Sequence, residues 1–381
     1  MELLIIIVSL LLFATYGGLI IYYRQSWISI PTFTANTNHH PDTKISIIIP
    51  ARNEEYNIAD CLNSIVQQSY PPHLFEVLVI DDHSTDNTAE VIKKYKHQNV
   101  HLISLKDFVA ANEINSYKKK AIEIAIGQSA GDLIITTDAD CILPRNWLQT
   151  IAAFYEEKNP AFIVMPVSIN CSNKFIEIFQ ALDFMTLQGI TGASVHKKFH
   201  SMCNGANLAY TKAAFNKVGG FKGIDNIASG DDMLLLHKIF NLYPDGIAYL
   251  KTNEVIVQTQ PVHTTAEFFN QRIRWASKAD KYDDKRIFAV LLLVYFFNVW
   301  IFLLAILAAI FTGTFAYVFI ITLVAKTITE MYFLFPVARF FNKLTILWHF
   351  PLAQPLHVLY TIIAGWLGKF GTYHWKERKV N

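Results

Sequence analysis

Eight consecutive residues near the middle of the chain decide its fold: Leu133-Ile134-Ile135-Thr136-Thr137-Asp138-Ala139-Asp140. Apolar and β-branched residues fill the first part of the stretch, which is the pattern of a strand buried inside a sheet. The stretch ends in two carboxylates separated by one alanine. Because ligands bind at the carboxyl ends of strands in an open α/β sheet, we expect this pair to face a ligand.

The close spacing of Asp138 and Asp140 has two interpretations. Two acids after a strand can be ordinary turn chemistry. They can also hold a hard divalent cation, Mg²⁺ or Mn²⁺, because neighbouring carboxylates repel and a cation that also touches substrate phosphates offsets that repulsion. The rest of the chain favours the cation.

The composition predicts membrane segments at both ends. The chain has 381 residues, of which 52% are hydrophobic, and its mean hydropathy is +0.26, too apolar for one ordinary soluble domain. Four apolar stretches are long enough to span a bilayer: Glu2–Tyr23, Ile287–Phe311, Phe315–Ala338 and Leu344–Leu367. The first lacks the basic start and small-residue cleavage site of a signal peptide, so we interpret residues 1–24 as an uncleaved anchor.

Basic residues beside the apolar stretches bear on topology. Arg24, Arg339, Lys343 and the tail of residues 369–381 each favour the cytoplasmic side. They cannot all lie there if all four stretches cross, so we expect Leu344–Leu367, which contains Pro351 and Pro355, to enter the membrane and return. Lys326 and Glu330 are costly in lipid and are expected to face each other or a polar cavity.

Charge and cysteine content exclude several classes of protein. The formal net charge of +2 gives no sign of a nucleic-acid binder. The four cysteines are far apart and form no Cys-x-x-Cys, so neither a zinc site nor a disulfide framework is indicated. We interpret them as reduced thiols of a cytoplasmic domain.

Strands and helices alternate with short connections from residue 45 onward, which predicts a doubly wound α/β domain with a mainly parallel sheet. No Gly-x-Gly-x-x-Gly follows the first strand, which argues against a dinucleotide fold. The expected strands are Ile45–Ile49, Glu76–Ile80, Val100–Ser104, the stretch leading to Asp138, and Phe162–Ser168. The expected helices are one with Ile58, Cys61, Leu62 and Ile65 on one face, Thr88–Tyr95, Lys118–Gln128, Phe175–Leu187 and Met233–Phe240.

Two further groups of charged residues follow predicted strands in the first half. Asp81 and Asp82 are either turn residues or ligands of a nucleotide base or ribose, since a carboxylate accepts from N–H and O–H groups. Lys118, Lys119 and Lys120 are most simply a solvated first helical turn. Alternatively, one of these lysines reaches a phosphate as a point charge.

Two groups in the second half have similar alternatives. Asp231 and Asp232 open a helix, where they either cap it and favour its dipole or supply a general base that accepts a hydroxyl proton. In Gln271-Arg272-Ile273-Arg274-Trp275, residues Gln271, Arg274 and Trp275 share one face if the segment is helical. That face is either an interfacial anchor, or Arg274 neutralises a diphosphate while Trp275 stacks on a sugar.

These residues in this order resemble the membrane-integrated family 2 glycosyltransferases over residues 44–286. The resemblance rests on Pro50-Ala51-Arg52-Asn53-Glu54-Glu55, Val79-Ile80-Asp81-Asp82-His83-Ser84-Thr85-Asp86, Asp138-Ala139-Asp140, Gly230-Asp231-Asp232 and Gln271-Arg272-Ile273-Arg274-Trp275. The tail Trp375-Lys376-Glu377-Arg378 is similar to a Trp-Lys-Gly-Arg tail of that family, with Glu377 in place of glycine.

The resemblance implies a GT-A fold, a nucleotide-diphosphate sugar donor and inversion at the anomeric carbon. For the donor, it implies that the nucleoside is held by Ala51, Arg52, Glu54, Asp82 and also Asp81, that Lys118 lies nearby, and that Asp138 and Asp140 position the diphosphate and its Mg²⁺ or Mn²⁺. It implies that the catalytic base is Asp232 or its neighbour Asp231. It also implies that the acceptor is held by Gln271, Arg274 and Trp275.

The expected protein is therefore a multi-pass enzyme of the cell (inner) membrane whose GT-A domain of residues 44–286 lies in the cytoplasm, with membrane segments at 1–24 and 287–368. It would transfer a sugar to a lipid or lipid-linked saccharide at the membrane interface. Gln-x-x-Arg-Trp also fits a processive polysaccharide synthase, although few spans are present for a polymer channel. A catalytically silent membrane scaffold with the same fold is a third alternative.

Overall fold

The computed structural model describes residues 2–36, 40–110, 113–200, 202–228, 230–277, 284–370, 373–375 and 378–380. Lys376 and Glu377 of the tail lie outside the described residues. Packing divides the chain into two compact units. The sheet unit comprises Pro31–Asn170 and Ser201–Gln260, and the membrane-helix unit comprises Met1–Ile30, Cys171–His200 and Pro261–Asn381.

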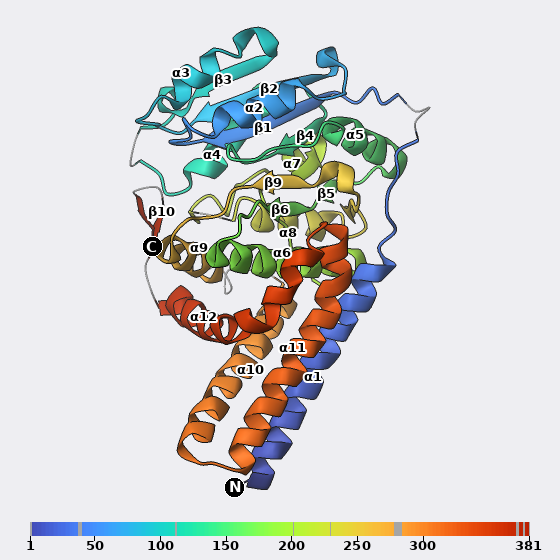
Figure 1. Cartoon of the computed structure of the whole chain (residues 1–381). Helices are drawn as coiled ribbons and strands as arrows, with labels where there is room; N and C mark the ends of the chain where they lie inside the picture. The colour runs from blue at the N-terminus through green and yellow to red at the C-terminus, as the bar shows by residue number, and fades with distance from the viewer. Residues whose placement is uncertain are drawn as a thin grey trace. The chain divides into compact units, whose positions relative to one another are not determined.

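The sheet unit is built on a seven-stranded, mostly parallel sheet (Figure 1). In spatial order its strands are β3 (Val100–Ser104), β2 (Phe75–Asp81), β1 (Ile45–Ala51), β4 (Leu133–Thr136), β7 (Leu208–Thr211), β5 (Phe162–Val164) and β8 (Ile247–Tyr249). The pairs β1–β2, β2–β3, β1–β4 and β5–β8 are parallel, whereas β7 is antiparallel to β4 and β5. The predicted α/β class with a mainly parallel sheet is confirmed.

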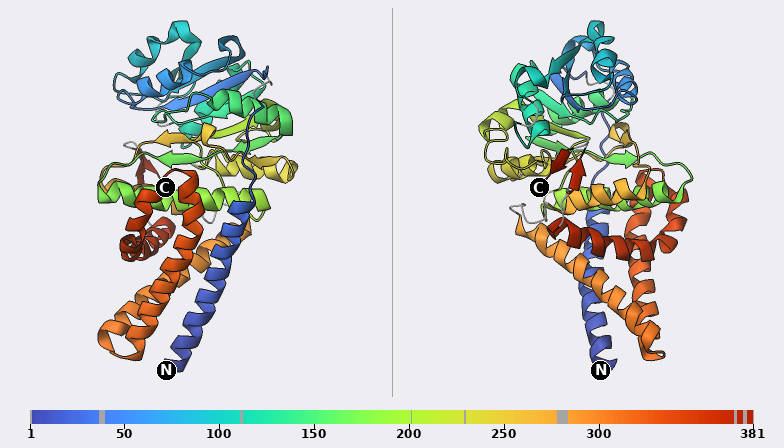
Figure 2. Two further views of the ribbon diagram at one scale, coloured as in Figure 1. Left: turned by 45° about the vertical axis from the view of Figure 1, so that its right-hand side comes forward. Right: turned by 90° about the vertical axis from the view of Figure 1, so that its left-hand side faces the viewer.

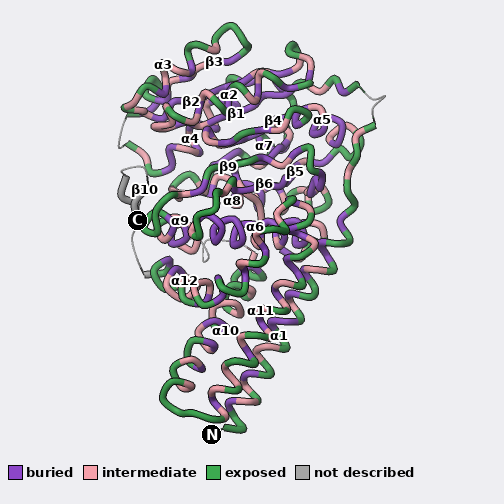
Figure 3. The backbone as a smooth tube through the Cα atoms, viewed as in Figure 1, coloured by how far each residue is buried: buried purple, intermediate pink, exposed green. Residues whose placement is uncertain are grey.

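Helices of the sheet unit flank this sheet, and the apolar face that the sequence predicts for the first of them is buried. They are α2 (Ile58–Val66), α3 (Thr88–Lys93), α4 (Tyr117–Gln128), α5 (Trp147–Lys158), α7 (Lys212–Lys217) and α8 (Met233–Leu242). The expected apolar face of α2 is buried, and β1 and β4 are buried along nearly their whole length (Figure 3). Strands with apolar residues at every position are typical of a parallel sheet covered on both faces.

The expected strand Phe162–Ser168 is wrong, because the structure divides it. Residues Phe162–Val164 form β5, and β6 (Val167–Ile169) pairs instead with β9 (Val257–Thr259) in a separate two-stranded sheet. Pro166 lies at the break and has no N–H to continue the ladder. Its carbonyl accepts from the backbone N–H of Val257 at 3.2 Å, and Val257 is the first residue of β9.

The membrane-helix unit contains four helices long and apolar enough to cross a membrane, counted over the described residues. Its helices are α1 (Glu2–Ser29), α6 (Phe175–Lys197), α9 (Thr265–Ala276), α10 (Lys285–Ile310), α11 (Thr314–Phe340), the 3₁₀ turn η5 (Leu344–His349) and α12 (Phe350–Phe370). Helices α1, α10 and α11 run side by side, whereas α12 runs across them (Figures 1 and 2). Residues Leu344–Lys369 are one of the four candidate spans, so the re-entry of Leu344–Leu367 stays a prediction.

Lys326 and Glu330 of α11 face each other, as the sequence predicts. The Lys326 ammonium is fully buried and lies 2.8 Å from Glu330 Oε1. It also donates to Gln354 Oε1 of α12 at 2.8 Å, and the Tyr16 hydroxyl of α1 donates to Glu330. Because both charges are paired and hydrogen-bonded, the segment can remain in an apolar environment.

Helix α6 is ten residues longer than the expected Phe175–Leu187, because it continues to Lys197. Gly189 and Gly192 lie in the added part and lower its intrinsic helix propensity. The structure shows why Gly189 is there: a Cβ on it would lie 2.7 Å from the Val337 side chain of α11. Close packing of two helices therefore offsets the cost of glycine.

Candidate active site

The carboxyl ends of β1, β2 and β4 meet at one edge of the sheet and carry the predicted site residues (Figure 1). Ala51 ends β1 opposite Asp81, which ends β2, so Asp81 belongs to a strand rather than a turn. Asp82 continues this pairing, since its N–H donates to the Ala51 carbonyl at 2.7 Å. The parallel register therefore brings the first two motifs together, as the sequence predicts.

Hydrogen bonds between side chains and backbone groups join the loop after β1 to the loop after β2. Arg52 Nη1 donates to the Asp82 carbonyl at 2.8 Å, and the Glu54 N–H donates to Thr88 Oγ1 at 2.8 Å. Asp86 accepts from the Glu55 N–H and from Thr88, and although burial raises the pKa of Asp86, these hydrogen bonds outweigh burial and lower it. The guanidinium of Arg52 thus braces the loop that carries Asp82.

The side chain of Asp82 is held by its neighbour. His83 Nδ1 lies 3.0 Å from Asp82 Oδ1, and its Nε2 lies 3.0 Å from the Val109 carbonyl. His83 adopts a left-handed backbone conformation with φ of 54°. Because Asp82 is 3% exposed and held by His83, which is itself held by the Val109 carbonyl, Asp82 is suited to recognising a rigid polar group.

A lysine links the two acidic motifs. Lys118 Nζ of α4 lies 2.8 Å from Asp138 Oδ1 and 3.2 Å from Asp231 Oδ2. Burial lowers the pKa of Lys118, but the carboxylates of Asp138, Asp231 and Asp232 outweigh burial and raise it above its usual value. Lys118 therefore remains charged between carboxylates, where it can also contact a phosphate.

The carboxyl of Asp140 lies close to other acidic side chains. Burial, together with the charges of Asp138 and Glu54, raises the pKa of Asp140 to about 6. Its Oδ2 accepts from Thr259 Oγ1 at 3.1 Å. No group of three or more His, Cys, Asp or Glu side chains that could hold a metal is found among the described residues. Two carboxylates still fit a Mg²⁺ or Mn²⁺ ion that takes its other ligands from phosphates and water.

Asp232 is the N-cap of α8 and accepts two backbone hydrogen bonds. Its Oδ1 accepts from the Met233 N–H at 2.7 Å and its Oδ2 from the Gly205 N–H at 3.1 Å. The capping interpretation of the sequence therefore holds geometrically. A carboxylate has about four lone-pair sites, which is more than these two hydrogen bonds use. Asp231 points to Lys118 instead, so the two acids have different surroundings.

The loop that precedes β7 contains Gly205 and lies beside the charged groups of the site. Because β7 runs antiparallel to β4, with Leu208 opposite Thr136, the loop lies at the carboxyl end of β4. A Cβ on Gly205 would lie 3.4 Å from both Lys118 Nζ and Asp231 Oδ2. The absence of a side chain at Gly205 thus leaves space beside the charged groups.

The expectation that Lys118, Lys119 and Lys120 form a solvated turn is wrong for Lys119. Lys118 is partly exposed and faces Asp138 and Asp231, and Lys120 is more exposed and pairs with Glu123 at 2.9 Å. Lys119 is 1% exposed and donates to the carbonyls of Ile224 and Ile227, each at 2.7 Å. Burial lowers the pKa of Lys119 to about 8. Lys119 thereby ties α4 to the segment that precedes Asp231, a role that three consecutive lysines do not reveal.

Replacing Lys119 with methionine is expected to destabilise this loop. The carbonyls of Ile224 and Ile227, two half-buried residues, would lose their donor, which costs up to roughly 1–3 kcal/mol for each group that water does not reach. The matched control is Lys120→Met, which removes a solvated lysine from the same turn. Thermal unfolding of both variants in detergent should show a lower midpoint for Lys119→Met alone. Equal midpoints would contradict the tie between α4 and the loop.

The remaining predicted residues, Gln271, Arg274 and Trp275, lie on α9 in the membrane-helix unit. The helix begins with a capping box between Thr264 and Glu267. Gln271 and Trp275 both contact Arg272, which the motif leaves unspecified: Arg272 Nη1 donates to Gln271 Oε1 at 2.7 Å, and its guanidinium lies 4.3 Å from the centre of the Trp275 ring. The sequence pattern indicates no role for Arg272.

Comparison with known proteins identifies the same family along most of the chain. The family described as glycosyl transferase family 2 matches residues 46–219, and glycosyl transferase family group 2 matches residues 133–364. The probable glycosyltransferase YdaM of Bacillus subtilis (strain 168) is 26% identical over 265 residues, which cover 67% of this chain and 59% of that protein. The beta-monoglucosyldiacylglycerol synthase of Synechocystis sp. is 24% identical over 255 residues, 65% of this chain and 50% of that protein.

One shorter match and one solved structure add to this comparison. The poly(ribitol-phosphate) beta-N-acetylglucosaminyltransferase TarS of Staphylococcus aureus is 36% identical over 115 residues, 30% of this chain and 19% of that protein. The chain thus spans between about a fifth and three fifths of these curated relatives. A mannosyltransferase from Pyrobaculum calidifontis, solved with GDP-Man and Mn²⁺, has a TM-score of 0.61 and 18% identity over 93% of this chain and 99% of that one. That similarity confirms the fold.

Proposed function

The chain belongs to glycosyl transferase family 2, and on that premise we propose that it transfers a sugar, with inversion, from a nucleotide-diphosphate sugar to a hydroxyl of an acceptor at the membrane interface. The GT-A fold and glycosyltransferase activity follow from the family. One observation supports the reaction most directly: Asp138, Lys118 and Asp231 form a continuous chain of ion pairs at the carboxyl edge of the sheet, beside Asp140 and Asp232.

Donor binding begins with the joined loops after β1 and β2. Asp82, fixed by His83, would accept hydrogen bonds from the nucleoside, together with Asp81, Ala51 and Glu54. Arg52 would act by holding the carbonyls of Asp82 and His83 in place. Preformed acceptors of this kind lower the entropy cost of binding a rigid base and ribose.

The diphosphate would lie next to Asp138, Asp140 and Lys118. Asp138 and Asp140 would hold a divalent cation, which neutralises charge that builds on the leaving diphosphate. Burial, and after it the charges of Asp138 and Glu54, raise the pKa of Asp140, so its negative charge is disfavoured at the position where a cation would stabilise it. Lys118 adds a second positive charge, and its pKa keeps it protonated throughout the physiological range.

Asp232 would be the general base that takes the proton of the acceptor hydroxyl. The sugar-diphosphate bond breaks through an oxocarbenium-like state, as in glycoside hydrolysis, and inversion requires the hydroxyl to attack from the opposite face. The backbone donors of Met233 and Gly205 fix the orientation of the Asp232 carboxylate. Asp231 is less suited to this role, because Lys118 already occupies its Oδ2.

An acceptor at the membrane interface is supported by α9 and by one relative. Helix α9 carries Gln271, Arg274 and Trp275 and belongs to the same unit as the four apolar helices. We assign Arg274 to the diphosphate and Trp275 to stacking on a sugar. A relative named beta-monoglucosyldiacylglycerol synthase aligns with 65% of this chain at 24% identity. We therefore propose a lipid or lipid-linked saccharide as the acceptor class. The enzyme would be a multi-pass protein of the inner membrane with its active site in the cytoplasm.

A processive polysaccharide synthase is the second candidate, because Gln-x-x-Arg-Trp occurs in synthases that hold a growing chain. The relative TarS is also named for a polymeric acceptor, although it matches only 30% of this chain. Product length on a defined acceptor separates the two candidates. A single added sugar supports the first, and a ladder of products supports the second.

Detergent-purified protein should release nucleotide diphosphate from one member of a panel containing UDP-glucose, UDP-N-acetylglucosamine and GDP-mannose. The acceptors are dioleoylglycerol and a polyprenyl-linked saccharide in mixed micelles, with Mg²⁺, Mn²⁺ or EDTA. We expect release to need one acceptor and to stop in EDTA, because the diphosphate charge is then not neutralised. Acceptor-dependent release at full rate in EDTA would contradict the metal assignment, and no turnover with any pair would contradict these acceptor classes.

A further inference from the structure

A buried ion pair joins two helices of the membrane-helix unit. Arg272 of α9 is 4% exposed and Asp183 of α6 is 6% exposed. Arg272 Nε donates to Asp183 Oδ2 at 2.9 Å, and Nη2 lies 2.6 Å from the same oxygen. A buried arginine–carboxylate pair contributes less to stability than well-packed apolar residues would, so its geometry calls for another explanation.

Arg272 uses the rest of its guanidinium to contact two members of the Gln-x-x-Arg-Trp motif. Its Nη1 donates to Gln271 Oε1 at 2.7 Å. The Trp275 ring lies over the guanidinium at 4.3 Å, and the Phe268 ring lies 4.7 Å from it. A planar cation offers donors at its edge and a face for stacking at the same time, which lysine cannot do. One side chain thus sets the orientation of both an amide and an indole.

Asp183 is in turn fixed from α12. The Tyr360 hydroxyl donates to Asp183, whose second oxygen is thereby occupied. The Tyr360 ring packs edge-on against Phe179 at 5.6 Å and Phe268 at 5.4 Å between ring centres. Three helices therefore converge on one carboxylate, which leaves little freedom to Arg272.

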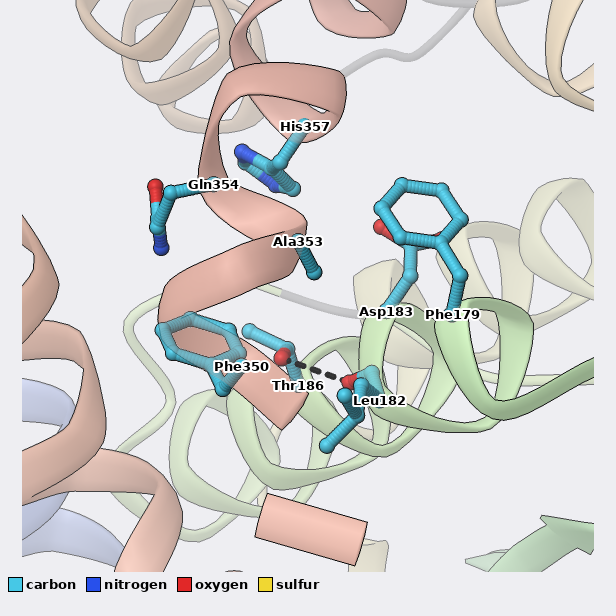
Figure 4. A pocket seen from close by; sticks show the side chains of 8 residues that line it. All are labelled: Phe179, Leu182, Asp183, Thr186, Phe350, Ala353, Gln354 and His357. Carbon is cyan, nitrogen blue, oxygen red and sulfur yellow. Dashed lines mark hydrogen bonds between the residues drawn. The ribbon is translucent and has the colours of Figure 1, made fainter. Parts of the chain in front are cut away.

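The space beside Asp183 is too small for a substrate. Figure 4 shows Asp183 and Phe179 projecting from α6 on the side where α12 carries His357 and Gln354. The cavity between them has a volume of about 10 Å³, which is room for roughly one water molecule. Asp183 can therefore affect the reaction only through the residue it holds, Arg272.

We propose that Arg272 and Asp183 are positioning residues that fix Gln271 and Trp275 in the orientation needed to bind the acceptor sugar. The proposal rests on the proposed function for the role of Trp275, but its structural part can be measured without turnover. Lysine at position 272 keeps the charge opposite Asp183 and loses the planar face. Arg272→Lys should therefore fold while releasing Gln271 and Trp275.

The first measurement is acrylamide quenching of Trp275 fluorescence. The chain has 7 tryptophans, so each variant is prepared with and without Trp275→Phe and the difference gives the signal of residue 275. The control is Arg286→Lys, because Arg286 forms an arginine–aspartate pair with Asp284 at 2.8 Å in the same unit but is half-exposed. Tyr360→Phe removes the hydroxyl bond to Asp183 and keeps the aromatic packing.

We expect the quenching constant of Trp275 to rise about twofold in Arg272→Lys, less in Tyr360→Phe and not at all in Arg286→Lys, because stacking on the cation shields the indole. In the transfer assay the acceptor KM should rise about tenfold or more in Arg272→Lys, with the donor KM unchanged, as expected for a misplaced binding group. Unchanged quenching would overturn the proposal. Increased quenching with an unchanged acceptor KM would confine Arg272 to a structural role. If wild-type protein shows no transfer while quenching changes as expected, the proposed function fails and the positioning of Trp275 stands.

Discussion

Replacing Asp140 with asparagine is expected to reduce metal-stimulated transfer by roughly three orders of magnitude, because a divalent cation that loses one of two carboxylates no longer offsets the leaving-group charge. Asparagine has nearly the same size as aspartate, and its amide can still accept from Thr259 Oγ1. The fold should therefore be preserved. Substitution also removes a negative charge that burial and the neighbouring carboxylates disfavour, as the raised pKa of Asp140 indicates, and this favours folding of the metal-free protein.

Initial rates measured against Mn²⁺ concentration check this prediction, with thermal unfolding as the measure of folding. The matched control is Asp132→Asn, at the residue just before β4, at the other end of the strand that delivers Asp140. That exposed aspartate should be replaceable without loss of rate. If Asp140→Asn kept a saturable response to Mn²⁺ with a wild-type maximum rate, Asp138 alone would have to hold the cation.

Strand positions and strand-end residues could be predicted from the sequence because both follow local rules. Apolar runs in β1, β2 and β4 indicate buried parallel strands, and the parallel register then places Ala51, Asp81 and Asp138 at one edge whatever the helices do. The break between β5 and β6 was missed because Val-Ser-Ile after Pro166 has strand character of its own. Only its pairing with β9, about ninety residues later in sequence, shows that it leaves the sheet.

Side-chain direction could not be predicted where it depends on distant segments. Lys118 and Lys119 look alike in sequence, yet one faces carboxylates and the other faces the carbonyls of Ile224 and Ile227. The contacts of Arg272 could not be predicted for the same reason, because its partner Asp183 lies 89 positions away on α6. A pattern that names Gln, Arg and Trp predicts which groups face substrate but not which residues hold those groups.

The second large effect concerns the choice of base between Asp231 and Asp232. Asp232→Asn is expected to lower kcat by about two to four orders of magnitude, because an amide cannot accept the acceptor proton. Asparagine is as good an N-cap as aspartate, so α8 should still begin at Met233, although the amide nitrogen of asparagine cannot accept from the Gly205 N–H. The donor KM should change less than kcat, since the Asp232 carboxylate accepts from the N–H groups of Met233 and Gly205, whereas Asp138 and Asp231 form the ion pairs with Lys118.

Asp231→Asn is the paired variant, and the geometry predicts a different response. It weakens the contact with Lys118 at 3.2 Å and leaves that lysine with Asp138, so donor binding should suffer more than the chemical step. Steady-state kinetics with donor and acceptor varied separately distinguishes the two effects. A reversed result, in which Asp231→Asn loses kcat and Asp232→Asn raises only the donor KM, would assign proton transfer to Asp231. In that case Lys118 would have to leave Asp231 when the donor binds, because a carboxylate paired with an ammonium is a poor base.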